Sequence, residues 1–160
     1  MTKRSHIPGR PTWLIRWLWK CRNEALWVYN FSGRLQETVE QAPKTIELEP
    51  QAGLPYALLA LAYADLGQRP EAMRAAEKGA SFAGDSPSVV ATASSALARA
   101  GQHARAKQLL EHALDLAKTR YVCRFIVAGA YADLGETERA FDSLELAFRQ
   151  QSTSLPGRVA

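Results

Sequence analysis

Four glycines recur along the chain at a constant interval of 34 residues: Gly33, Gly67, Gly101 and Gly135. Two of these glycines end the same pentapeptide, Tyr-Ala-Asp-Leu-Gly, at 63–67 and at 131–135. Glycine lacks a Cβ atom and adopts turn conformations that other residues resist. A glycine at a fixed interval therefore predicts a repeated turn, and this period predicts an array of stacked supersecondary units.

Small and large side chains follow the same period. Five residues after each glycine lie Thr38, Ala72, Ala106 and Ala140, and seven further on lie Thr45, Gly79, Ala113 and Ala147. Four residues before each glycine lie Tyr29, Tyr63, Leu97 and Tyr131. Small residues allow two helices to cross closely, and large residues fill the space between units. The pattern predicts helical hairpins in which each glycine ends the first helix.

This skeleton resembles the tetratricopeptide repeat family over residues 19–154. The aromatic residue that opens a repeat of that family is present as Tyr56, and the closing proline as Pro50. The resemblance implies an all-α, right-handed solenoid of about four helix hairpins, preceded here by an aromatic N-terminal helix. The segments ETVEQAPKTIELEP and RYVCRFIVAGAYADLGETERAFDSLELAFRQQS are similar to arrays at the C-terminal ends of bacterial multidomain signalling proteins. That similarity implies a detached or truncated array of the sensor type.

The period divides the chain into three regions. Residues 1–18 form a basic and aromatic segment, residues 19–154 form the array, and residues 155–160 form a C-terminal tail. The four units of the array span 19–52, 53–86, 87–120 and 121–154. Pro43 falls within the second helix of the first unit, where we expect it to kink or shorten that helix.

Composition limits the classes that the chain can belong to. A hydrophobic content of 47% argues against disorder over the whole length. Two distant cysteines, Cys21 and Cys123, form neither a disulfide framework nor a zinc spacing. The sequence has no apolar run of roughly 18 residues and no uninterrupted signal-peptide core. We therefore expect a cytoplasmic protein in a reducing compartment.

Sequence signatures of catalysis are missing. The chain contains no phosphate-binding loop, dinucleotide fingerprint or nucleophile elbow. His103 and His112 lie nine residues apart, which is not the spacing that places two ligands on one helix face. We expect no enzymatic activity, no cofactor and no metal site.

The resemblance implies that the first helices of the repeats line a concave groove that binds a protein or peptide. The groove candidates are Trp27, Asn30, Phe31, Leu58, Leu61, Asp65, Thr92, Ser95, Arg99, Ile126 and Asp133. Together with Phe125, the apolar members suit an apolar helix or extended segment. The charged candidates Asp65, Arg99 and Asp133 are expected to help select the partner. Chaperone-binding family members hold a peptide carboxylate with two lysines and two asparagines, of which this chain offers only Lys20 and Asn23.

Both ends of the array carry apolar residues that need an explanation. The N-terminus combines Trp13, Trp17 and Trp19 with six basic residues before Gly33, against Glu24 alone. It predicts a cap on the first repeat, or alternatively a surface that binds a membrane or a nucleic acid, or a poorly ordered tail. The last helix carries Phe141, Leu144, Leu146 and Phe148. These predict self-association or a missing partner, unless Leu155 and Val159 fold back over them.

Overall fold

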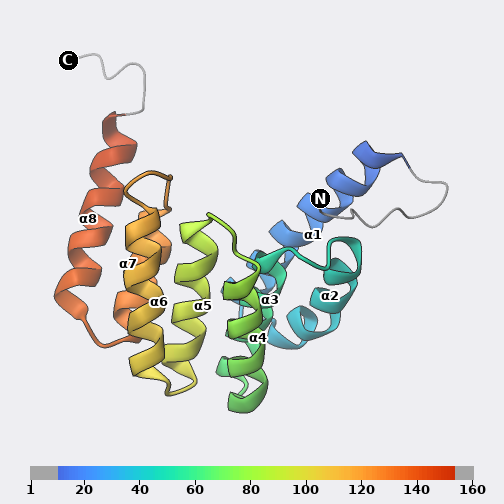
Figure 1. Ribbon diagram of the computed structural model, residues 1–160, viewed down its shortest axis with the longest axis horizontal. Helices are drawn as coiled ribbons and strands as arrows, with labels where there is room; N and C mark the ends of the chain where they lie inside the picture. The colour runs from blue at the N-terminus through green and yellow to red at the C-terminus, as the bar shows by residue number, and fades with distance from the viewer. Residues whose placement is uncertain (1–10, 154–160) are drawn as a thin grey trace.

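The computed structural model describes residues 11–153 and places eight α-helices there, with no strand among these residues. The helices are α1 (Thr12–Phe31), α2 (Leu35–Leu48), α3 (Gly53–Asp65), α4 (Arg69–Ser81), α5 (Pro87–Arg99), α6 (His103–Leu116), α7 (Arg124–Asp133) and α8 (Thr137–Thr153). Consecutive helices pack in four pairs, α1 with α2, α3 with α4, α5 with α6 and α7 with α8. These hairpins stand side by side, with α1 at one end of the row and α8 at the other (Figure 1). The all-α class and the four hairpins expected from the period are confirmed.

Each hairpin turns at one of the four period glycines. Gly33, Gly67, Gly101 and Gly135 all adopt positive φ, between 73° and 88°. The residue after each glycine donates its backbone N–H to the carbonyl of the large residue four positions before the glycine. In the second hairpin this is the 2.8 Å bond from Gln68 to Tyr63. This geometry satisfies carbonyls that the end of a helix would otherwise leave unpaired. The predicted role of the glycines as helix-ending turns is confirmed.

The two helices of the second hairpin cross at Gly79. A Cβ atom on Gly79 would lie 2.9 Å from the backbone nitrogen of Ala57, and one on Gly53 would lie 2.4 Å from the carbonyl oxygen of Gly79. No side chain fits at such distances, so α3 and α4 approach backbone to backbone. Ala72, the small residue earlier in α4, is fully buried. The predicted small positions are therefore the places where the helices touch.

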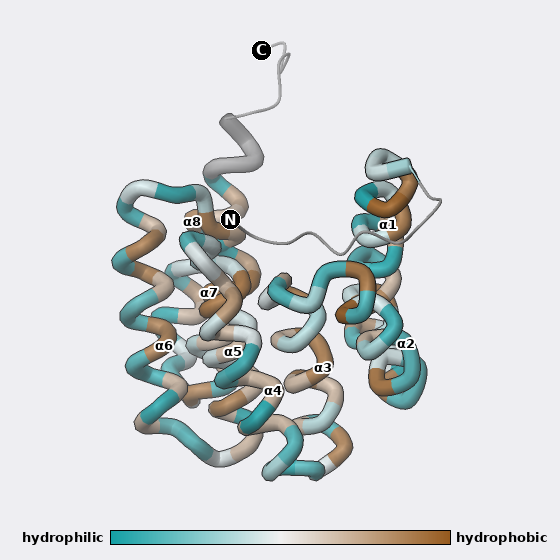
Figure 2. Tube along the Cα trace, turned by 45° about the vertical axis from the view of Figure 1, so that its right-hand side comes forward, coloured by the Kyte–Doolittle hydropathy of each residue, from teal (hydrophilic) through white to brown (hydrophobic). Residues whose placement is uncertain are grey.

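The helices form two layers. The odd-numbered helices pack against one another in chain order, α1 on α3, α3 on α5 and α5 on α7. Each even-numbered helix packs on the odd helix before it. The core runs through the odd layer, where Leu26, Leu58, Val90, Leu97 and Val127 are all but fully buried. Helix α6, by contrast, alternates hydrophilic and hydrophobic residues along its length, as a half-exposed helix does (Figure 2).

The first helix differs from the expectation. We predicted a separate aromatic helix before the array, but residues 12–31 form one continuous helix of 20 residues. No glycine or internal proline interrupts the sequence between Thr12 and Phe31, so nothing breaks the helix near residue 18. Helix α2 likewise continues past Pro43 to Leu48 and is not shortened there. Leu155, Val159 and the rest of the predicted tail lie outside the described residues.

None of the helices in residues 11–153 combines the length and the apolar content that crossing a bilayer requires.

Candidate functional site

Three charged side chains, one period apart, form a ladder across the odd layer. Asp65, Arg99 and Asp133 are the last residues of α3, α5 and α7. One terminal nitrogen of Arg99 donates to both carboxylate oxygens of Asp65, at 2.8 and 3.1 Å, and its Nε donates to Asp133 at 3.1 Å. The hydroxyl of Ser95 also donates to Asp133. We call Asp65, Arg99, Asp133 and Ser95 the charge ladder.

The two carboxylates of the charge ladder stabilise the positive charge of Arg99. Partial burial lowers the pKa of Arg99, but the carboxylates of Asp133 and Asp65 outweigh that effect and raise it above its ordinary value. The guanidinium therefore stays protonated, and its charge is shared between two neighbours. Opposite charges placed one period apart are visible in the sequence, so the pairing could have been predicted from the repeat. Sequence reasoning instead assigned all three residues to partner selection.

Three aromatic rings gather elsewhere on the odd layer. The rings of Trp27 and Phe31 stack within α1, with centroids 5.4 Å apart and planes 13° apart. Phe31 also meets Phe125 of α7, with centroids 6.1 Å apart. Phe31 is 66% exposed and Phe125 is 55% exposed, whereas Trp27 is half-buried against the core. We call Trp27, Phe31 and Phe125 the aromatic patch.

The contact between Phe31 and Phe125 shows how the layer curves. Packed helices lie about 8–10 Å apart, so α1 and α7 would be roughly 24–30 Å apart in a flat row with α3 and α5 between them. Their aromatic rings nevertheless touch. The odd layer must therefore curve inward, and the aromatic patch lies on its concave side.

Several groove candidates are less accessible than we expected. Leu58 is 0% exposed and Thr92 is 1% exposed, while Leu61 and Ser95 are also buried. The exposure expected for these four is wrong, because interior repeats are covered by a hairpin on each side. Ile126 is half-buried.

The amide candidates also face the protein. Asn30 donates its Nδ2 to the carbonyls of Leu26 and Leu58, at 3.0 and 3.3 Å, and so joins α1 to α3. Asn23 is buried, with its Nδ2 donated to the carbonyl of Trp19. An asparagine in that position cannot reach out to hold the carboxylate of a peptide.

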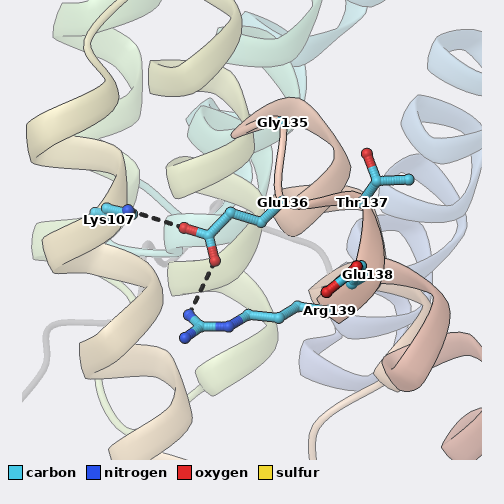
Figure 3. A pocket seen from close by; sticks show the side chains of 6 residues that line it. All are labelled: Lys107, Gly135, Glu136, Thr137, Glu138 and Arg139. Atoms are coloured by element: carbon cyan, nitrogen blue, oxygen red, sulfur yellow. Dashed lines mark hydrogen bonds and ion pairs between the residues drawn. The ribbon is translucent and has the colours of Figure 1, made fainter.

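A polar hollow of about 530 Å³ lies between α6 and the first turn of α8. Figure 3 shows the carboxylate of Glu136 between Lys107 and Arg139, each 2.9 Å away. The hydrogen bond from Lys107 lowers the pKa of Glu136 below its ordinary value. A carboxylate held ionised by two cations is a weak general base and cannot serve as a general acid near neutral pH.

Within residues 11–153 no cluster of three or more histidine, cysteine or acidic side chains is placed to hold a metal ion. His103 and His112 are exposed on α6. Cys21 and Cys123 both carry free thiols.

A comparison with protein-family models finds no match, and a search of the curated proteins finds no similar sequence.

Proposed function

We propose that the chain is a non-enzymatic interaction module, a right-handed solenoid of four tetratricopeptide-like hairpins that binds a partner segment on the concave side of its odd layer. The 34-residue period and the four identical turns support this family assignment. A reducing, cytoplasmic setting belongs to the same proposal.

The observation that carries the proposal is the aromatic patch. Phe31 and Phe125 come from the first and last hairpins, meet at 6.1 Å, and yet stay more than half exposed. Aromatic residues held on a rigid surface are the usual anchors of protein–protein contacts. Exposed apolar surface of this kind marks an interaction site more often than chance.

The chemistry of the patch favours an apolar partner segment. Trp27 and Phe31 offer a stacked face, and Phe125 offers a ring tilted by 50° to Phe31. Such a surface suits the apolar side of a helix or of an extended peptide. In this proposal the charge ladder has a secondary role in selectivity, because Arg99 already pairs with Asp65 and Asp133.

The proposal assigns no catalytic role. Glu136 and Glu77 are both kept ionised by neighbouring cations, Lys107 and Arg105 respectively. Paired carboxylates of this kind stabilise the packing of helices and do not supply a poised acid or base.

The test is affinity measurement with a defined peptide. Peptides selected from a random display library on the full chain would be labelled and titrated with the protein by fluorescence anisotropy. We expect Phe31→Ala and Phe125→Ala each to weaken binding about tenfold, the effect of losing one aromatic anchor. Tyr121→Ala is the matched control, because Tyr121 is 83% exposed.

Two results contradict the proposal. One is a library that yields no binder at all, and the other is a binder whose affinity both phenylalanine variants leave unchanged while they stay folded by circular dichroism. Substitution of Leu58 is unsuitable for this test, because the side chain is fully buried and its loss would lower the free energy of unfolding by about 2–5 kcal/mol.

A further inference from the structure

The face that ends the array, beyond α7 and α8, is apolar and open. A hollow of about 280 Å³ lies there between the two helices. The residues that matter are Phe125, Ala128, Ala132, Ala140, Phe141 and Leu144, which we call the end face. Phe141 is 65% exposed and Leu144 is 39% exposed.

Five of these six positions are buried one repeat earlier, the exception being Lys107, which stands 34 residues before Phe141 and is exposed. Ala98 and Leu110 stand 34 residues before Ala132 and Leu144 and are almost fully buried, whereas Ala132 and Leu144 are exposed. The third hairpin is covered because α7 packs on α5. The end face therefore has the chemistry of a surface on which a further odd-type helix packs.

The opposite end of the array exposes a helix of that type. Trp13, Trp17, Cys21, Glu24 and Val28 follow one another at intervals of three or four residues, so they form a single stripe along α1. We call them the α1 stripe. All five side chains are exposed.

The α1 stripe matches the side by which later odd helices pack on the hairpin before them. Pro55, Leu58 and Ala62 of α3 stand 34 residues after Cys21, Glu24 and Val28, and all three are buried. In α5 the residues at the two outer positions, Val89 and Ala96, are buried as well. Among the helices that the structure describes, α1 is the one whose corresponding side is exposed.

We propose that the chain associates head to tail with a second copy of itself, the α1 stripe of one copy packing on the end face of the next. The contact repeats the packing that the chain already uses between its own hairpins. One association covers exposed apolar residues at both ends of the array at once. Because the contact joins two different faces, each copy keeps one face free, and the assembly grows with concentration.

Charge supports this choice of occupant. Arg16 and Lys20 are exposed beside the α1 stripe, one helical turn apart. Helix α1 has three basic residues and one acidic residue, whereas residues 136–149 have four acidic and two basic residues. Glu145 of α8 is itself paired with Arg149. The two ends of the array thus have net charges of opposite sign, which favours encounter of the two unlike faces.

One residue of the α1 stripe opposes the contact. Glu24 stands where α5 has Thr92 and α7 has Ile126. An ionised carboxylate against an apolar surface costs free energy of desolvation. Replacing Glu24 by isoleucine, the residue of α7 at this position, should strengthen the association.

The experiment is sedimentation velocity on the full chain over a range of concentrations. We expect the mean mass of the wild type to rise with concentration, and Glu24→Ile to shift that rise to at least tenfold lower concentration. Val28→Glu and Phe141→Glu, both at exposed positions, should each be monomeric with unchanged circular dichroism. Mixed together, these two variants retain one intact pair of unlike faces and should form a dimer that grows no further.

Three results overturn the proposal. In the first, wild type and Glu24→Ile both stay monomeric at the highest concentration. In the second, Val28→Glu alone still dimerises, which would mean that two end faces meet each other. In the third, the wild type binds vesicles of anionic phospholipid, Trp13→Ala with Trp17→Ala abolishes that binding, and the two glutamate variants fail to form a mixed dimer. This last outcome would assign the α1 stripe to a membrane surface.

Discussion

Arg99 binds Asp65 through one guanidinium nitrogen, which lies 2.8 and 3.1 Å from the two carboxylate oxygens. The two residues stand one period apart and occupy the same place at the ends of α5 and α3. Asp133, one period further on, receives the Nε of the same guanidinium. A repeat that brings equivalent positions side by side also brings like charges together, and the alternation of acid, base and acid removes that repulsion.

Loss of the central charge should therefore destabilise the array. We expect Arg99→Met, which keeps much of the side-chain stem, to lower the free energy of unfolding by about 1 kcal/mol, the sum of two partly exposed ion pairs. The difference should shrink in 1 M salt, where the Debye length falls to about 3 Å. Urea denaturation at low and high salt measures both effects.

The matched control is Arg74→Met. Arg74 forms a more exposed pair with Glu71 within a single helix, at 3.1 Å. We expect its loss to change the free energy of unfolding by about 0.3 kcal/mol or less. Equal effects of the two substitutions would show that the charge ladder contributes nothing beyond an ordinary surface pair.

The glycines of the chain should respond oppositely to alanine according to their backbone conformation. Gly67 has a φ of +75° and open space where a Cβ would lie, so Gly67→Ala tests backbone strain alone. We expect a loss of about 1–2 kcal/mol in the free energy of unfolding. Gly129 lies inside α7, also with open space, and Gly129→Ala should stabilise by up to about 1 kcal/mol.

Urea denaturation of the two variants provides the comparison. A Gly67→Ala protein with the same free energy of unfolding as the wild type would mean that the turn does not require positive φ. The explanation of the 34-residue period would then lose its physical basis.

The sequence predicted the turns well because they depend on single residues. A positive φ is a property of one position, and glycine at that position is sufficient to mark it. The crossing at Gly79 is equally local, since it depends on the absence of one side chain. The charge ladder was also predictable, because its three charged members lie at one position of the repeat.

Exposure was less predictable. In the interior helix α5 every residue from 89 to 98 is buried, so the helix has no single apolar side to recognise in the sequence. Alanine is small enough to occupy any side of such a helix. The groove candidates Thr92 and Ser95 were placed on the surface because the first helices of the repeats line a groove in the family that the sequence resembles. The meeting of Phe31 and Phe125 depends on the rotation that accumulates over three hairpins. A period in the sequence does not specify that rotation.

Acid should weaken the contact between α4 and α6. The hydrogen bond from Arg105 lowers the pKa of Glu77 below its ordinary value of 4.5. A carboxylate with a lowered pKa in the folded state stabilises the fold above its unfolded pKa, and that contribution is lost as the pH falls through the folded value. We expect the wild-type melting temperature to drop below about pH 4.5, and the drop to be smaller in Glu77→Gln.

The control for the predicted pH dependence of the melting temperature is Glu111→Gln. Glu111 is exposed on α6 and forms no ion pair with the described residues. Its substitution should leave the shape of the pH profile unchanged. A Glu77→Gln profile parallel to that of the wild type from pH 7 to pH 3 would contradict the prediction.

The curvature of the odd layer predicts an energetic coupling between Phe31 and Phe125. Contacting aromatic rings are worth about 0.5–1.5 kcal/mol beyond their burial, and two exposed rings should lie near 0.5 kcal/mol. The double-mutant cycle Phe31→Ala, Phe125→Ala and the double variant, measured by urea denaturation, isolates this term. In a parallel cycle that combines Phe31→Ala with Tyr121→Ala, the two effects should be additive, because Tyr121 is 83% exposed. Additivity in both cycles would mean that the first and last hairpins do not meet in solution, and that the aromatic patch does not exist as one surface.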